Sequence, residues 1–386
     1  MSSNKHYLPI LLLAGAVSLW TSCAPKEPTA EPVEETFATQ SEKLLFKVDT
    51  LSDQLKSPWG LTWISDGRML VTEKKGKILV FKDDKLTGDS IQGLPEVFAV
   101  SQAGLFDVVA HPKYDENGWI YIAYAKMFED SAAATTIMRF KLDGNTAVEK
   151  QDLISAGPPW KGGQHFGGRI VFDNDGYLFF SNGEKSKIPM KAQNLNNAHG
   201  KIHRIKDDGT IPTDNPFTDS LGNVTSIWTY GNRNPQGLYF DKASNVLWET
   251  EHGPKGGDEL NVIEKGKNYG WPIITYGINY NGTILAESAE KEGMEQPIHY
   301  WVPSIATAGM IVVNSDKYPG WKGNILVGAL AKQHIARVVL KDNKLAVEEK
   351  LLPGIGRVRQ IAESPDGYIY AITEGTGLLI KIIPVN

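Results

Sequence analysis

The sequence predicts an all-β protein folded as a six-bladed β-propeller with four-stranded antiparallel blades. A turn followed by an apolar strand recurs six times, and no long stretch keeps the 3.6-residue apolar period of a helix. The composition, with 38 Gly, 21 Pro and 10 Trp, is typical of a protein with many tight turns and large aromatic anchors. A chain of 386 residues with 41% apolar residues is long enough to bury a large core.

Each repeat centres on a small residue that joins two apolar runs, which is a strong hairpin signal because such turns need a positive φ. The six turn residues are Gly67, Gly118, Gly176, Asn245, Gly323 and Gly367. Intervals of 44 to 78 residues match propeller blades better than the evenly spaced strands of a barrel. The upstream partner strands are predicted at 61–64, 105–110, 170–172, 238–240, 310–313 and 360–362. Third strands are predicted at 78–81, 137–142, 201–205 and 335–340, and residues 279–296 are predicted to be a surface loop.

The N-terminal residues 1–23 predict an export signal. Lys5 and His6 precede an apolar run over 7–20, which is too short to be a comfortable membrane span. Cys23, the only cysteine, follows that run as in a bacterial lipobox, so we expect a lipid-anchored protein at the periplasmic or cell-envelope face. The alternative is a plain secretory signal with an incidental cysteine.

Residues 24–43 contain three Pro and five Glu and little that a core would bury, so they predict a flexible tether. The propeller domain is then expected over 44–386.

Charge and motifs exclude several functions. The formal net charge of −5 leaves no basic footprint for nucleic acid. The sequence contains no phosphate loop, no dinucleotide-binding glycine fingerprint, no nucleophile elbow and no zinc signature. His199 and His203 share a strand or helix face, but no third ligand accompanies them, which favours a structural role.

Residues just before the innermost strand of each blade should ring one mouth of the central channel, because equivalent positions surround one axis. These positions hold Trp59, Gln102, His165, Arg233 with Asn234, Ser304, and Arg357 with Arg359. Arginine binds carboxylates bidentately, and histidine accepts a proton near neutral pH. The ring therefore predicts a polyanionic ligand beside a general base.

Several motifs resemble those of one family, the soluble quinoprotein glucose/sorbosone dehydrogenases, and in particular its aldose sugar dehydrogenases that depend on pyrroloquinoline quinone (PQQ). The longest matches are GNRNPQGL at 231–238 and EHGPKGGDELN at 251–261. Shorter ones are PWGL at 58–61, HFGGR at 165–169, NYGWP at 268–272 and RVR at 357–359. They occur in family order over nearly the whole predicted domain.

The resemblance implies a six-bladed propeller that binds PQQ and calcium and oxidises aldose sugars at C1 to the lactone. It implies that His165 is the general base, which takes the C1 hydroxyl proton while hydride passes to the quinone. Arg233 and Asn234 would hold the quinone oxygens, and Gln102, Lys332, Arg357 and Arg359 would bind the rest of the cofactor. Gly253 and Pro254 would offer backbone carbonyls to calcium, with Asp258 supporting the base and substrate side. An external electron acceptor would then reoxidise the enzyme.

Two departures from the family pattern limit what can be transferred. The family's cofactor-binding lysine directly follows a Leu in the fifth blade, whereas here Ala331 follows Leu330 and Lys332 comes one place later. A one-residue shift turns a strand side chain to the other face, so Lys332 would reach the cofactor only where a bulge restores its register. Gln164 precedes the base where the glucose-specific branch has an acid, so the substrate preference does not transfer.

Two other functions stay open from the sequence. A propeller hydrolase of sugar lactones would need a carboxylate-rich metal cage, whereas the ring positions are rich in Arg. A non-catalytic lipoprotein that binds glycans or proteins would keep the scaffold without a cofactor. Mixing apoprotein with PQQ, calcium, aldoses and a dye acceptor distinguishes all three.

Overall fold

The computed structural model describes residues 38–42 and 44–385. In this part of the chain nearly every regular element is a β-strand. The exceptions are α1 (Tyr114–Asn117) and two short 3-10 turns, Glu129–Ser131 and Pro189–Gln193. None of the described helices is long and apolar enough to cross a membrane.

The strands form six antiparallel sheets, each made of consecutive strands apart from the last. Blade 1 contains β3 (Pro58–Trp63), β4 (Arg68–Glu73), β5 (Lys77–Lys82) and β6 (Lys85–Ser90). Blade 2 contains β7 (Leu105–Ala110), β8 (Ile120–Met127), β9 (Ala132–Asp143) and β10 (Thr146–Lys161). Blade 3 contains β11 (Ile170–Phe172), β12 (Leu178–Asn182), β13 (Lys201–Ile205) and β14 (Ile227–Tyr230).

The second half of the ring repeats the pattern. Blade 4 contains β15 (Pro235–Asp241), β16 (Val246–Glu251), β17 (Asp258–Val262) and β18 (His299–Trp301). Blade 5 contains β19 (Thr307–Val312), β20 (Ile325–Ala329), β21 (His334–Lys341) and β22 (Lys344–Leu351). Blade 6 contains β23 (Arg357–Glu363), β24 (Ile369–Glu374) and β25 (Leu379–Pro384), together with β2 (Leu45–Ser52) and β1 (Ala38–Gln40) from the other end of the chain.

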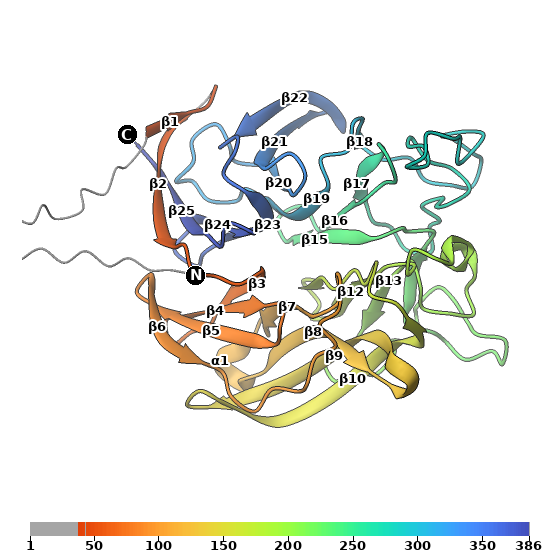
Figure 1. Ribbon diagram of the computed structural model, residues 1–386, viewed down its shortest axis with the longest axis horizontal. Helices are drawn as coiled ribbons and strands as arrows, with labels where there is room; N and C mark the ends of the chain where they lie inside the picture. Colours follow the sequence, from red (N-terminus) through yellow and green to blue (C-terminus); the bar gives the residue numbers. More distant parts are fainter. Residues whose placement is uncertain (1–37, 43, 386) are drawn as a thin grey trace, which may run out of the picture. The chain divides into compact units, whose positions relative to one another are not determined.

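The predicted six-bladed propeller is therefore confirmed. The six predicted turn residues all have positive φ, between 58° and 86°. Neighbouring innermost strands contact each other in the order β3, β7, β11, β15, β19, β23 and back to β3, which closes the ring (Figure 1). The segment 279–296 contains no helix or strand and runs between β17 and β18, as predicted.

Ring closure depends on pairing between the two ends of the domain. β2 pairs antiparallel with β25, from Phe46 opposite Pro384 to Ser52 opposite Leu379, as Figure 1 shows. β1 pairs in turn with β2 and makes blade 6 five-stranded. The predicted tether over 24–43 is thus too long at its C-terminal end, because 38–40 belong to the sheet. Residues 1–37, including Cys23, lie outside the described part of the chain.

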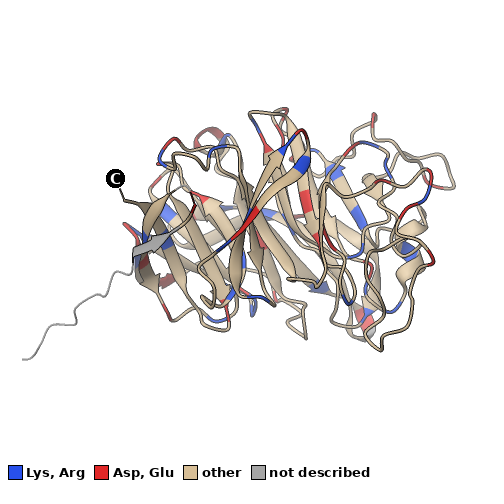
Figure 2. Cartoon of the chain, turned by 90° about the horizontal axis from the view of Figure 1, so that it is seen from above, with Lys and Arg blue, Asp and Glu red and all other residues tan. Residues whose placement is uncertain are grey.

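The hydrophobic core consists of six layers, one between each pair of adjacent blades. Each buried cluster takes its side chains mainly from two neighbouring sheets, for example Leu70 and Val80 of blade 1 with Val108 and Ile122 of blade 2. Acidic and basic residues are interspersed along the chain (Figure 2). Because every innermost strand runs the same way along the channel, strand starts gather at one mouth and strand ends at the other.

Candidate functional site

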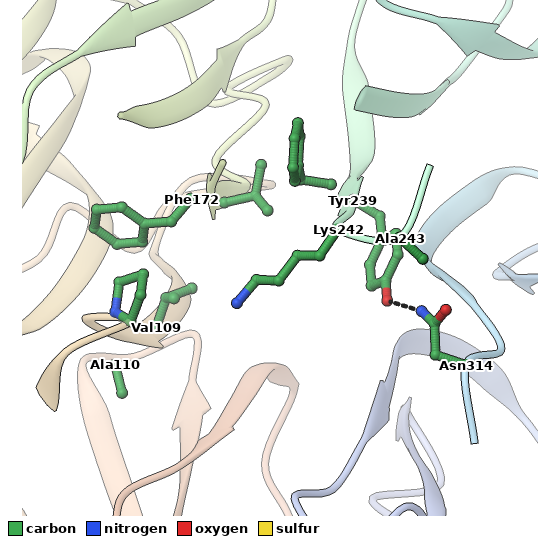
Figure 3. A pocket seen from close by; sticks show the side chains of 10 residues that line it. Val109, Ala110, Phe172, Tyr239, Lys242, Ala243 and Asn314 are labelled. Carbon is green, nitrogen blue, oxygen red and sulfur yellow. Dashed lines mark hydrogen bonds between the residues drawn. The ribbon is translucent and has the colours of Figure 1, made fainter. Parts of the chain in front are cut away.

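Each mouth of the channel contains a cavity, and the two differ in chemistry. The larger, about 640 Å³, lies where the innermost strands end, and Figure 3 shows it lined by Val109, Phe172, Tyr239 and Lys242 among others. Its walls are mostly apolar, and Lys242 is the one charged residue among those that line it. This mouth offers no acid–base pair.

The smaller cavity, about 120 Å³, lies where the innermost strands begin and is strongly polar. Five residues predicted for the ring line it: Trp59, Gln102, Asn234, Arg357 and Arg359. Lys74, Ser101, Gln236, His252 and Glu374 complete its polar lining. This mouth is the candidate active site.

His165 lies at this mouth, next to the lining residues Phe166 and Gly167. Its backbone adopts φ 52°, and its N–H donates to Gln102 Oε1 at 3.0 Å, which fixes the turn. Nδ1 lies 2.9 Å from Oε1 of Glu184, a carboxylate whose side chain is 1% exposed. An imidazole that donates Nδ1–H to a carboxylate keeps its lone pair on Nε2. Within the described residues Nε2 has no hydrogen-bond partner, so it is free to accept a proton.

Burial lowers the pKa of His165 below its usual value, and the nearby Arg233 lowers it further, while the bond to Glu184 opposes both effects. The imidazole is therefore neutral at neutral pH, which is the form that a general base needs.

Arg233 and Asn234 enter from blade 4, just before β15. Both backbone N–H groups donate to Oε2 of Glu251, the Asn234 bond measuring 3.1 Å. Arg233 Nη1 donates to the carbonyl of His252 at 3.0 Å, while its buried Nε has no partner among the described residues. A buried donor without a partner costs free energy, which fits a site built for an acceptor.

Arg357 and Arg359 project from β23 into the cavity. Arg359 donates from Nη2 to Glu374 at 2.7 Å and from Nη1 to Gln236 at 2.8 Å, and its Nε is buried without a described partner. Arg357 donates to the carbonyl of Leu330 at 3.3 Å. Three arginines with two unpartnered donors fit a cofactor that carries carboxylates and quinone oxygens.

Gly253 and Pro254 form a buried loop after β16. Within residues 38–42 and 44–385, neither carbonyl oxygen accepts a hydrogen bond. Buried carbonyls are usually paired, and calcium takes oxygen ligands of this kind, so the loop fits the predicted metal site. Among the described residues no cluster of three His, Cys, Asp or Glu side chains is placed to hold a metal ion.

Asp258 organises this loop. Its Oδ1 accepts the Gly253 N–H at 2.9 Å, and its Oδ2 accepts the N–H groups of Ala306 at 2.6 Å and Thr307 at 3.3 Å. The carboxylate that contacts the base is instead Glu184. The geometry therefore connects Asp258 with the predicted metal loop.

Three predicted ring members, His165, Arg233 and Ser304, are not among the residues that line the cavity, and neither is the predicted cofactor residue Lys332. Ser304 is half-buried beside the segment that Asp258 holds, and Lys332 is exposed after β20. Leu330 lines the cavity in place of Lys332, and the ammonium present there is that of Lys74 from blade 1. The β20 strand ends at Ala329, and no bulge beyond it turns Lys332 inward.

Sequence reasoning missed the carboxylates, and they share a position in the repeat. The second strand of a blade runs back toward the mouth where the first strand begins, and Glu73, Glu251 and Glu374 each end such a strand. Glu184 follows β12 by two residues. Inspecting strand ends as well as strand starts in the repeat would have found all four.

Arg169 does not line the cavity but hydrogen-bonds to residues that do. It is 1% exposed and donates to the carbonyls of Trp59, Gln236 and Arg359 and to Asp107 at 2.7 to 3.4 Å. One side chain of blade 3 thereby joins the innermost strands of four other blades. Three of those partners present their own side chains to the cavity.

His199 and His203 have structural contacts, as predicted. His203 stacks on Phe180 with ring centroids 4.6 Å apart and contacts Ser226, and burial lowers the pKa of His203 to about 3. His199 contacts the carbonyl of Pro158 at 2.9 Å.

Comparisons with known proteins agree with this geometry. Residues 55–381 match the glucose/sorbosone dehydrogenase family. The chain is 39% identical to the aldose sugar dehydrogenase YliI of Escherichia coli K12 over 346 residues, which cover 88% of this chain and 93% of that protein. It is 28% identical to quinoprotein glucose dehydrogenase B of Acinetobacter calcoaceticus, over 98% of this chain and 95% of that protein.

Solved structures show the same relationship. The apo form of the soluble E. coli aldose sugar dehydrogenase superposes with a TM-score of 0.84 at 38% identity, covering 88% of this chain and all of that one. The PQQ-bound aldose sugar dehydrogenase of Streptomyces coelicolor superposes with a TM-score of 0.71 at 25% identity, covering 88% of this chain and 98% of that one. The fold, the site and these matches together show that the chain belongs to the glucose/sorbosone dehydrogenase family.

Proposed function

We propose that this quinoprotein sugar dehydrogenase oxidises the C1 hydroxyl of an aldose to the lactone with PQQ and calcium as cofactors. The observation that carries the proposal is the His165–Glu184 pair at the same channel mouth as three arginines. It places a neutral base beside donors suited to a polycarboxylate. The PQQ-bound relative from S. coelicolor and the quinoprotein of A. calcoaceticus support the same cofactor.

His165 performs the proton transfer. Its Nε2 accepts the proton of the C1 hydroxyl, and the resulting imidazolium is stabilised by the carboxylate of Glu184 at Nδ1. The Gln102 side chain holds the His165 backbone so that the ring keeps its orientation. Bound PQQ would supply the quinone that accepts the hydride from C1.

The other residues bind and polarise the cofactor. Arg233 and Asn234 would hold the quinone oxygens, where preorganised donors stabilise developing negative charge. Arg357 and Arg359 would bind carboxylates, and Lys74 from the adjacent blade 1 adds a further cation to the lining. The carbonyls of Gly253 and Pro254 would hold calcium, and Asp258 fixes the loop that carries them by accepting the Gly253 N–H.

Reconstitution tests this function. Purified apoprotein is mixed with PQQ and calcium, and aldoses and a dye acceptor are added. Dye reduction that requires both cofactors supports the proposal, and the lactone product identifies C1 as the oxidised carbon. Lactone hydrolysis without PQQ would instead identify a hydrolase, and binding of sugars without turnover would identify a non-catalytic protein.

We also propose that the protein is exported and anchored through Cys23 at the periplasmic or envelope face, where an external acceptor takes the electrons. The basis is the apolar run before Cys23 and the polar segment behind it.

A further inference from the structure

Glu374 occupies a special place in the candidate site, because it supplies the anion that the cavity's own arginines bind. Its Oε2 accepts Arg359 Nη2 at 2.7 Å and lies 3.5 Å from Arg357 Nε. Arg357 and Glu374 face each other across β23 and β24 in direct register. One carboxylate oxygen therefore serves both guanidinium groups that are expected to bind a ligand carboxylate.

The cavity is small. Its volume of about 120 Å³ compares with roughly 300–1,000 Å³ for typical small-molecule sites. Glu374 is itself one of the lining residues, and its side chain is 24% exposed, whereas that of Arg359 is 9% exposed. Of the two partners, the carboxylate is therefore the one with room to move toward solvent.

The charge at the cavity wall is also shaped by Glu374. The ionised side chains that line the cavity are the cations Lys74, Arg357 and Arg359 and the anion Glu374. Burial raises the pKa of Glu374, but Arg359 with its hydrogen bond and the nearby Arg357 and Lys74 together lower it more, so the net shift is downward and the carboxylate is ionised at neutral pH. His252 adds no charge because burial lowers its pKa to about 3.

We propose that Glu374 is a resident anion that holds the Arg357–Arg359 pair in the unloaded protein and competes with a ligand carboxylate for it. The inference rests on the proposed function, since it assumes a polycarboxylate cofactor at this mouth. Loading then exchanges the bond from Arg359 to Glu374 for a bond to the ligand. Cofactor affinity is set partly by how easily that exchange occurs.

Competition and positioning predict opposite changes in ligand affinity when the charge of Glu374 is removed. If Glu374 competes, removing its charge leaves the arginines more available and ligand anions bind more tightly. If Glu374 only orients Arg359, removing its charge loosens the guanidinium and ligand anions bind more weakly. Glutamine is the suitable replacement because it keeps the length of the side chain and an oxygen that can still accept from Nη2.

The experiment measures the dissociation constant of PQQ by fluorescence titration of the full-length apoprotein in calcium, without sugar. We expect Glu374→Gln to bind PQQ about tenfold more tightly than wild type. The substitution removes, from a partly exposed site, a negative charge that repels the carboxylates of the ligand. Trimesate, a redox-inert tricarboxylate, is titrated in the same way, and its affinity should rise in the same direction. Glu374→Asp retains the charge and should stay within about threefold of wild type.

Glu349→Gln is the matched control, because Glu349 bonds the buried Arg337 at 2.6 Å in the outer part of blade 5 and does not line the cavity. Its PQQ affinity should equal that of wild type. Unchanged or weaker binding by a folded Glu374→Gln variant, while wild type binds PQQ, would overturn this inference alone. Absence of PQQ binding by wild type would overturn the proposed function, and the inference with it.

Discussion

Replacing Glu184 by glutamine isolates what the carboxylate does for His165. The two side chains meet at 2.9 Å, and Glu184 is almost fully shielded from solvent. A hydrogen bond to a charged group in such a setting contributes about 1.5–3 kcal/mol. The carboxylate exerts this effect most strongly when His165 has taken the proton, because an imidazolium then lies against an anion.

Glutamine keeps the volume but removes the charge, so the transition state loses stabilisation that the ground state does not need. We expect kcat/KM to fall about 10- to 100-fold, since each 1.36 kcal/mol is a factor of ten. PQQ affinity should change little, because the cofactor contacts come from other blades.

The pH dependence gives an independent readout. The base works when unprotonated, so the rate falls as the pH drops through the pKa of His165. Burial holds that pKa below its usual value, and Glu184 partly restores it. Removing the charge of Glu184 should therefore move the acidic limb of the pH–rate profile to still lower pH, while the rate on the plateau falls.

The assay is single-turnover reduction of bound quinone by an aldose, followed by absorbance across the acidic and neutral pH range. Glu73→Gln is the control, because Glu73 ends the second strand of blade 1 and accepts the Lys56 N–H, without contacting His165. The role given to this pair would be refuted if the Glu184→Gln variant kept the wild-type rate on the plateau of the pH–rate profile. It would also be refuted if the acidic limb of that profile moved to higher pH.

Four further predictions follow from the same geometry. His165→Gln should retain PQQ but reduce it about 10²–10⁴-fold more slowly, and near-normal reduction in a single turnover would move the base elsewhere. Chelating calcium should abolish PQQ binding and leave the β-sheet circular dichroism intact; loss of that signal would reveal a structural metal. Arg169→Met should lower the free energy of unfolding, measured in urea, by about 3–5 kcal/mol, because it leaves the buried Asp107 carboxylate without its cationic partner. An unchanged midpoint of urea unfolding would contradict that account. Cys23→Ala should shift the full-length protein from the detergent to the aqueous phase, and equal partitioning of both forms would argue against lipidation.

Much of the fold follows from local sequence signals. Turn residues such as Gly67 and Asn245 adopt the positive φ that their residue type favours, and the apolar runs around them form the first two strands of each blade. Because a propeller repeats one local unit about an axis, the phase of each repeat also placed Trp59, Gln102 and Arg359 at one mouth. These features depend on residues close together in the chain.

Only the tertiary structure decided the features that depend on contacts between distant segments of the chain. Ring closure by β2 against β25 joins the two ends of the domain, and no local pattern marks 45–52 as the outer strand of the last blade. Lys332 was predicted from a family position, whereas the structure presents Lys74 of blade 1 to the cavity instead.

The partners of the site residues were decided in the same way. His165 and Glu184 are 19 residues apart in the chain, and Arg169 joins carbonyls from three other blades and the Asp107 carboxylate of a fourth. The sequence by itself determined which residue types line the mouth, because the repeat sets their phase. Only the folded ring decided which carboxylate faces which cation, because antiparallel pairing returns each second strand to that mouth and brings its terminal side chain against a strand start.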